Sequence, residues 1–489
     1  MKSRIFALIL TLSLLLSAFA GCGTESEPSS KAGTGGTAEQ AGIPTSSLPS
    51  GTSDGTSDAA EMDEEEIVLD YSGFVMPAAT GSLTVYSTNM PGLILRPAVE
   101  RFRELYPEVA VDFQTLGEDE YQTRLQTEIP AGKGPDVLFG NSGSAEVSDV
   151  YKIIEAGILE DLNPYMQNDP DFHEEDYYDV LGVGLLNGVR GILPVEIDLP
   201  ILQTTEEALA DAGISRDEFR TWDGFMAAAH RYKEQYPENT IFSYGRSSGY
   251  LSSMVKNSGM SFIDYRNRVP SVDREKMEQL CEFCSLDFLE GAPEIWDDWY
   301  QQGGAPILRK ALFSSFSPSV IQLSMDRVYA EEQGETLIFE TVPDVYDGVT
   351  AELVYYAGIP KSSPNKLNAW RFILVLLSDE IQGGSNPPGY NYLRLGFPMR
   401  RESMERRITW TVTDFYCGGS PDFPEYDDDI ERDIADITEV YGRMTACRAV
   451  QRQVMKYIGT NIKAVFKGKA PFDKYFDKLY STLELYASE

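Results

Sequence analysis

The sequence predicts an α/β fold, in which helices cover the faces of a parallel sheet. Residues 83–87 and 109–113 alternate apolar and polar side chains, a pattern typical of strands. Residues 99–106 between them carry apolar side chains at helical spacing, and a proline follows. A second helix over 121–129 and an apolar run over 137–139 give the order strand, helix, strand, helix, strand. Strands joined through helices normally pair in parallel, with the helices packed on the sheet.

The turn from the second helix into the third strand is the most informative stretch. Residues 131–136 contain two glycines, which permit unusual backbone angles, and a proline, which stops the helix. Asp136 can close this turn with its own side chain. The strand then ends in a polar loop over residues 140–143. Because ligands of open α/β sheets bind beyond the carboxyl ends of strands, we expect Asn141 and Ser142 to face a ligand.

The chain length and the net charge limit the number of domains and the class of ligand. A chain of 489 residues is too long for one ordinary core and predicts two domains. The 41 basic and 77 acidic residues give a net charge of −36, which argues against binding nucleic acid, because its phosphates would be repelled. The acidity permits a cationic ligand but does not require one, and a strongly solvated surface is the simpler explanation.

Residues 1–21 have the pattern of a secretory signal peptide, with basic residues before an apolar run that is too short for a typical transmembrane helix. Residues 19–22, Phe-Ala-Gly-Cys, resemble a bacterial lipobox. The resemblance implies that Cys22 receives a diacylglycerol and anchors the protein to the outer face of the bacterial cytoplasmic membrane. The alternative is a cleaved, freely secreted protein. Residues 22–80 are rich in Gly, Ser, Thr, Pro and acids, and we expect a disordered, lipid-anchored linker there.

The four remaining cysteines give little support for a metal site. Cys281 and Cys284 are three apart on a predicted helix, which indicates two core positions more simply than a metal or redox pair. Neither histidine lies near them in sequence. Cys417 and Cys447 are candidates for a disulfide. The sequence therefore predicts neither a metal nor a cofactor.

The catalytic motifs in the sequence are incomplete. Residues 245–249 match the Gly-x-Ser-x-Gly nucleophile elbow, but that motif requires a later histidine, and His173 and His230 both precede it. The sequence contains no Walker phosphate loop and no complete dinucleotide fingerprint. A glycosidase needs only two correctly spaced carboxylates, which the 77 acidic residues leave open. The sequence thus predicts a protein that is not an enzyme, with a tethered glycoside hydrolase as the alternative.

A series of segments, in the right order, resembles the extracellular solute-binding proteins of ABC importers, the sugar-binding family 1. The matching segments are 83–86, 102–109, 134–137, 157–165, 193–194, 211–214, 221–225, 359–366, 369–372 and 458–489. The resemblance covers about residues 81–489. It implies a periplasmic-binding-protein-like fold, with two α/β lobes joined by hinge segments and a ligand cleft between them.

The resemblance also divides the chain. The N-terminal lobe would comprise residues 81–195 and 336–362, and the C-terminal lobe residues 196–335 and 363–489. The chain would cross between the lobes at about 193–200, 330–336 and 360–364. Trp370 is assigned to a core, because it lies on the apolar face of a predicted helix.

A sugar site needs aromatic rings to stack on the sugar and polar side chains to bind its hydroxyls. The groups at the positions that the resemblance implies are Thr88, Asn89, Asn141, Ser142, Glu196, Asp198, Tyr244, Arg246, Tyr250, Phe316, Ser317, Tyr355 and Tyr356. Plainer roles exist for several of them. The asparagines can cap turns, the last two tyrosines can pack in a core, and the two acids can form salt bridges at the hinge.

The expected function follows from the resemblance. A solute, most simply a carbohydrate, binds between the lobes of a monomer, the hinge closes, and the closed form docks on the membrane permease. Where the family often places an aromatic or charged residue after the third strand, this chain has Gly140-Asn141-Ser142-Gly143, which can bind hydroxyls but cannot stack. A cationic solute such as a polyamine is therefore an alternative, and a protein ligand at a decayed site is another.

Overall fold

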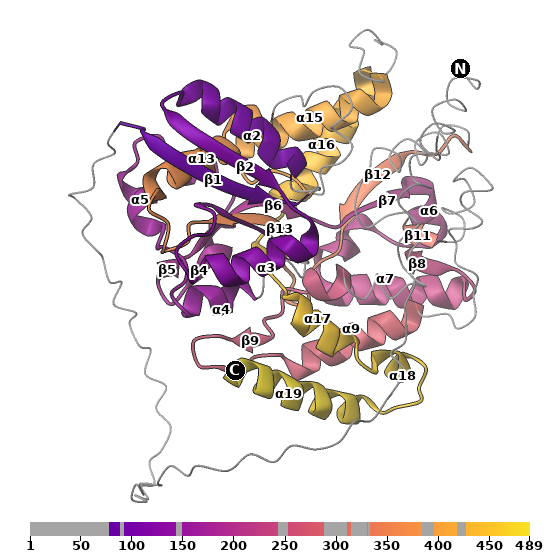
Figure 1. Cartoon of the computed structure of the whole chain (residues 1–489). Helices are drawn as coiled ribbons and strands as arrows, with labels where there is room; N and C mark the ends of the chain where they lie inside the picture. The colour runs from indigo at the N-terminus through magenta and orange to yellow at the C-terminus, as the bar shows by residue number, and fades with distance from the viewer. Residues whose placement is uncertain are drawn as a thin grey trace, which may run out of the picture. The chain divides into compact units, whose positions relative to one another are not determined.

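Strand β1 (Gly81–Ser87) is the first strand in the part of the chain that the computed structural model describes (Figure 1). The structure describes residues 78–88, 92–142, 149–242, 253–287, 311–313, 330, 333–383, 396–417 and 427–489. All of them belong to the unit Leu69–Glu489. The predicted signal peptide, Cys22 and most of the predicted linker lie outside the described residues.

The predicted order of strands and helices in the first part is confirmed. β1 pairs in parallel with β2 (Val109–Thr115), and helix α2 (Gly92–Leu105) connects them. Helix α3 (Glu118–Glu128) leads into β3 (Leu138–Asn141). A parallel bridge between Val85 and Val137 places the start of β3 beside β1. The turn that the two glycines and the proline predict therefore delivers β3 to this sheet.

Strand β13 (Thr350–Gly358) is the centre of a mixed sheet. It runs antiparallel to both β3 and β6 (Ile192–Asp198) and parallel to β14 (Ala446–Arg448). The α/β class is confirmed, but the expectation of an all-parallel sheet is wrong for β13. The reason is the path of the chain. β6 ends where the chain leaves this core, whereas β13 begins where the chain returns to it, so the two strands run in opposite directions.

The first hydrophobic core gathers around these strands. Its further elements are α4 (Val150–Glu155), α5 (Asn163–Asn168), η2 (Leu181–Gly184), β4 (Leu185–Leu186), β5 (Val189–Arg190), α13 (Lys366–Leu377), α14 (Asp379–Gln382), α15 (Arg401–Cys417) and α16 (Asp427–Gly442), with η1 (Glu174–Asp176) between α5 and η2. Trp370 is fully buried in this core, and its indole N–H donates a hydrogen bond to Asp169 at 2.6 Å. The assignment of Trp370 to a core is confirmed.

The second hydrophobic core is built mainly from helices and aromatic side chains. Its elements are α6 (Glu206–Asp211), η3 (Arg216–Arg220), α7 (Trp222–Gln235), β8 (Thr240–Phe242), β9 (Ile263–Asp264), β10 (Val269–Pro270), α9 (Arg274–Asp287), β11 (Ala311–Phe313), α17 (Arg452–Gly459), α18 (Ile462–Phe466) and α19 (Phe472–Ser488). Trp222 packs against Phe225 and Phe283 at its centre. Cys281 and Cys284 are buried here as free thiols, so their interpretation as core positions is confirmed.

Two neighbouring strands carry the chain between the cores. β7 (Ile201–Thr205) pairs antiparallel with β12 (Leu337–Thr341), and the two lie side by side in Figure 1. Ile201 belongs to the first core and Leu202 to the second. A third passage follows β14, because Cys447 packs in the first core and Val450 in the second.

Residues 363–447 pack differently from the division that the sequence implies. Helix α13 belongs to the first core, where Phe372 lies 5.7 Å from Phe102, ring centre to ring centre. The crossing expected at 360–364 is wrong, since the apolar faces of α13 and α16 fit the first core. We propose that the first lobe comprises residues 81–201 and 349–447, and the second lobe residues 202–345 and 450–489.

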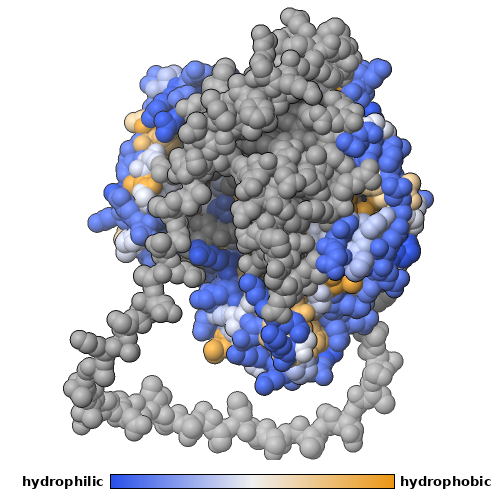
Figure 2. All heavy atoms as spheres, turned by 90° about the vertical axis from the view of Figure 1, so that its right-hand side faces the viewer, coloured by the Kyte–Doolittle hydropathy of each residue, from blue (hydrophilic) through white to orange (hydrophobic). Residues whose placement is uncertain are grey.

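On the face that Figure 2 shows, the described residues are mainly hydrophilic. Figure 2 shows one face on which apolar side chains are scattered singly among hydrophilic ones. This distribution fits the net charge of −36. Within the described residues, no helix combines the length and the apolar character that a bilayer crossing requires.

Candidate ligand-binding site

Part of the predicted site lies within the described residues. Thr88, Asn141, Ser142, Glu196, Asp198, Tyr355 and Tyr356 are described. The predicted residues outside the described ranges are Asn89, Tyr244, Arg246, Tyr250, Phe316 and Ser317. Five of these seven residues lie on β3, β6 and β13, whereas Thr88 directly follows β1 and Ser142 directly follows β3.

Three predicted residues form one row across the mixed sheet. On β13, Tyr355 lies opposite Asn141 of β3 and opposite Glu196 of β6. Residues directly opposite each other in regularly paired antiparallel strands point to the same face, as Asn141 and Tyr355 do, whereas register shifts interrupt the pairing of β13 with β6 on both sides of Tyr355. The structure therefore brings together the amide of Asn141 and the phenol of Tyr355, which are 214 positions apart, and the backbone of Glu196 pairs with Tyr355 on its other side. Asn141, at the end of β3, is the half-buried member of the row, and the other two are buried.

The aromatic members of the predicted site are packed. The ring of Tyr355 stacks on Phe139, with 5.4 Å between ring centres. Tyr356 points to the other face of β13, where its ring covers Gly140. A Cβ atom on Gly140 would lie 2.3 Å from Cζ of Tyr356. Gly140 therefore belongs to a strand that accepts a close ring, and the expectation of a loop beginning at Gly140 is wrong.

Ser142 and Thr88 contact the backbone around them. The Ser142 hydroxyl donates to the carbonyl of Leu353, and its backbone N–H donates to the carbonyl of Val354 at 3.1 Å. These two bonds continue the pairing of β3 with β13 by one residue. Thr88 is buried, and its carbonyl accepts a hydrogen bond from the Ser87 hydroxyl at 2.7 Å. A role of either residue in ligand binding stays a prediction.

A second row joins Asp198, a predicted site residue, to charges that the sequence did not single out. Asp198 of β6 lies opposite Glu352 of β13, and Glu352 pairs with Arg448 of β14. The Lys256 ammonium lies 2.5 Å from a carboxylate oxygen of Glu352. Burial raises the pKa of Glu352, and Lys256 opposes that shift. Single charges in separate strands leave no spacing signal, so sequence reasoning had no means of grouping them.

Asp149 of the first lobe accepts hydrogen bonds from the second. It precedes helix α4 and accepts from the backbone N–H of Tyr151 at 3.0 Å. The hydroxyls of Tyr265, at 2.5 Å, and Tyr486, at 2.7 Å, also donate to it. Burial raises the pKa of Asp149, and the hydrogen bonds oppose this shift. This contact joins α4 to the β9–β10 hairpin and to α19.

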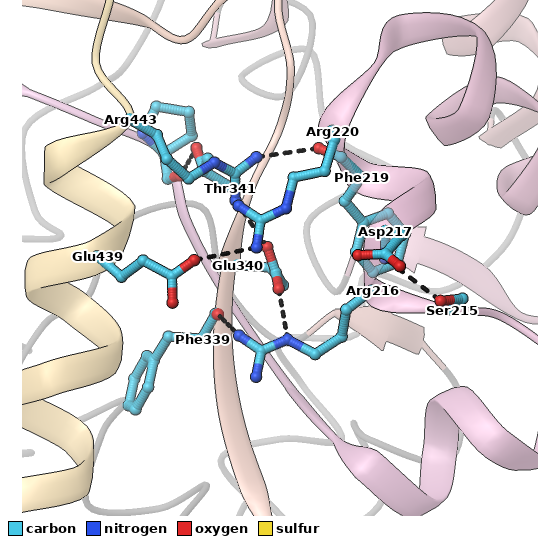
Figure 3. Close-up of polar contacts among 11 residues, drawn as sticks. Ser215, Arg216, Asp217, Phe219, Arg220, Phe339, Glu340, Thr341, Glu439 and Arg443 are labelled. Carbon is cyan, nitrogen blue, oxygen red and sulfur yellow. Dashed lines mark hydrogen bonds and ion pairs between the residues drawn. The ribbon is translucent and has the colours of Figure 1, made fainter.

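A buried carboxylate on crossing strand β12 is held by two arginines (Figure 3). Glu340 accepts from Nε of Arg216 at 2.6 Å through one oxygen and from Nη1 of Arg443 at 2.9 Å through the other. Arg216 also donates to the carbonyl of Phe339, and Arg443 to that of Phe219, both at 3.1 Å. Burial lowers the pKa of Arg443, and Glu340 counters this shift. We call Arg216, Glu340 and Arg443 the crossing clamp.

The described residues contain no group of three His, Cys, Asp or Glu side chains arranged to hold a metal ion. The chemistry that this part of the chain offers is hydrogen bonding by amide, carboxylate and phenol groups at the end of a sheet. Such groups bind polar solutes without covalent change.

Comparison with known proteins agrees with the fold. Residues 87–268 match the model of the bacterial extracellular solute-binding protein family. A search of curated proteins gave no match. Among solved structures, the sugar-binding protein MalE from Xanthomonas citri has a TM-score of 0.58 and 15% identity, over 83% of this chain and 97% of that chain.

Two further structures share the fold at a similar level of sequence identity. The cyclic α-maltosyl-1,6-maltose binding protein from Arthrobacter globiformis has a TM-score of 0.54 and 15% identity, over 84% of this chain and 99% of that one. An ABC substrate-binding protein from Listeria monocytogenes, in complex with cycloalternan, has a TM-score of 0.52 and 15% identity, over 84% and 100%.

The fold is thus that of the periplasmic-binding-protein-like solute-binding proteins, as the sequence predicts. Residues 87–268 are similar to the bacterial extracellular solute-binding proteins, as the resemblance in the sequence predicts. This match supports the predicted class of function, a solute-binding component of ABC transport.

Proposed function

We propose that this protein captures a carbohydrate between its two lobes and delivers it to the permease of an ABC importer. The observation that carries the proposal is the row of Asn141, Tyr355 and Glu196 at the end of β3, beside the passage of the chain into the second lobe. The relatives support the solute class, since MalE from Xanthomonas citri is a sugar-binding protein and the Listeria protein is in complex with cycloalternan.

Binding requires no covalent step in this proposal. The amide of Asn141 offers both donors and an acceptor to sugar hydroxyls, and Asp198 offers acceptors near the crossing. The remaining contacts come from the second lobe. A solute that contacts both lobes stabilises the closed state by its differential affinity for that state, and the permease then recognises the closed form. The protein works as a monomer and catalyses no reaction.

The anchor is the second element of the proposal. Cys22 carries the lipid, and residues 23–80 form the tether that lets the folded part reach solutes outside the cytoplasmic membrane. Replacing Cys22 by serine removes the acylated thiol. Fractionation of cells that express Cys22→Ser should find the protein released, whereas wild type sediments with membranes. Equal membrane retention of both proteins would contradict the anchor.

The solute class is tested by thermal unfolding of the purified full chain with a panel of oligosaccharides. The panel contains cycloalternan, cyclic α-maltosyl-1,6-maltose and acarbose, with spermidine and a short peptide as contrasting solutes. A sugar present at about 100 times its Kd stabilises the folded protein by about 2.7 kcal/mol. We expect stabilisation by at least one sugar. No shift with any sugar would contradict the proposal, and a shift with spermidine alone would favour a cationic solute.

The site is tested with a matched pair of variants. Asn141→Ala should lose most of the sugar-induced shift, because an amide that binds hydroxyls is removed. Gln126→Ala, an exposed amide on α3, should keep the full shift. Chromatography of the incubated sugar separates receptor from enzyme, since a receptor returns the sugar unchanged and a glycoside hydrolase cleaves it.

A further inference from the structure

The crossing clamp lies at the point where the chain passes between the lobes. Along β12, Leu337 and Phe339 pack in the first core while Ile338, between them, packs in the second. Glu340 follows directly, and its side chain is 1% exposed. A carboxylate at this position is withdrawn from water on a strand that touches both cores.

The two arginines of the clamp come from different lobes. Arg216 lies in η3, and Phe219 of the same turn is part of the second core. Arg443 follows helix α16 directly, and Val440 of that helix is part of the first core. Figure 3 shows the guanidinium groups approaching Glu340 from opposite elements, η3 on one side and α16 on the other.

The hydrogen bonds of the crossing clamp depend on the relative position of the two lobes. Each carboxylate oxygen has its own arginine, and Arg443 also reaches across to the Phe219 carbonyl of the other lobe. Moving the lobes apart at this point would separate at least one guanidinium from the carboxylate. A buried charge that loses its partner is strongly unfavourable, because little water is present to solvate it.

We infer that Glu340 is a positioning residue, whose grip on one arginine from each lobe fixes the preferred orientation of the lobes in the solute-free protein. The orientation in turn sets the apparent solute affinity, because a solute that needs one orientation binds in proportion to the population of that state. This second step rests on the proposed function, whereas the first does not.

A comparison pair is built into the same region. Arg220 and Glu439 form an ion pair at 3.0 Å that also joins η3 to α16, but Glu439 is 56% exposed. Glu439→Gln therefore removes a charge from a pair between the same two elements without stranding a buried group. Glu340→Gln keeps side-chain size and removes the charge between two arginines.

The test measures lobe orientation directly in the full-length protein without solute. Fluorophores attached to non-canonical amino acids at Glu104 of α2 and Glu234 of α7, which are exposed in the first and second lobes, report the distance between lobes by single-molecule energy transfer. Native cysteines stay untouched. We expect Glu340→Gln to change the ratio of the lobe orientations by about 5- to 150-fold, the usual range of coupling between two states. Glu439→Gln should match wild type.

The results test separately whether Glu340 sets the lobe orientation and whether that orientation affects solute binding. An unchanged distance distribution in folded Glu340→Gln would overturn the inference, whatever solute binds. A changed distribution without binding of any sugar would support the clamp and count against the proposed function. Should Glu340→Gln fail to fold, Arg443→Lys carries the test, because lysine keeps the charge but lacks the guanidinium fork. A changed distance distribution in folded Arg443→Lys then supports the inference, an unchanged one overturns it, and failure of both variants to fold assigns the clamp to folding and overturns it.

Discussion

Replacing Asp136 by alanine should destabilise the first lobe more than any surface change. The buried carboxylate accepts from the backbone N–H of Thr84 at 2.7 Å and from the Ser363 hydroxyl at 2.6 Å. The Asn365 amide adds a longer contact of 3.2 Å that water can replace. Hydrogen bonds to a charged group contribute about 1.5–3 kcal/mol each, so losing the two short ones should lower the free energy of unfolding by about 3–6 kcal/mol.

The assay is urea unfolding followed by circular dichroism, with two comparison variants. Asp136→Asn keeps one acceptor oxygen without the charge and should lose about 1–2 kcal/mol. Asp179→Ala removes an exposed carboxylate and should stay within about 0.5 kcal/mol of wild type. The reasoning would be refuted if Asp136→Ala unfolded within 1 kcal/mol of wild type, taking about 1 kcal/mol as an ordinary substitution.

Three further predictions concern packing and ionisation. Gly140→Ala should lower stability by about 1–3 kcal/mol, because its Cβ would overlap the ring of Tyr356, whereas Gly182→Ala has open space; equal urea midpoints would contradict this. The raised pKa of Glu352 means that its contribution to stability is present below the ordinary value of 4.5 and is lost as pH rises through the raised native value. Glu352→Gln should therefore gain stability relative to wild type with rising pH, and a pH-independent difference in urea unfolding would speak against it. Burial raises the pKa of Cys281 to about 12, so iodoacetamide should alkylate this thiol only after unfolding, and rapid labelling of the native protein would exclude the packing described.

Local sequence patterns predicted the first part of the fold well. The alternation in 83–87 and 109–113 and the spacing in 99–106 found β1, β2 and α2, because these signals lie within one element each. A bond from the Asp136 side chain within its own turn was expected. The hydrogen bonds of Asp136 to Thr84, Ser363 and Asn365 were not, since these partners are 52 to 229 positions away.

The pairing of strands that are distant along the chain could not be predicted from the sequence. Nothing near Asn141 indicates that Tyr355 is its neighbour across the sheet, and the antiparallel direction of β13 depends on where the chain re-enters the first core. The crossing clamp could not be predicted from the sequence for the same reason. Arg216, Glu340 and Arg443 are unremarkable charges until the fold removes Glu340 from water.

The most direct measurement is a crystal structure of the protein grown with the sugar that gives the largest thermal stabilisation. The proposed function predicts one sugar held by residues of both lobes, with the Asn141 amide within hydrogen-bonding distance of a hydroxyl. A sugar bound to one lobe alone, or bound away from the end of β3, would contradict it.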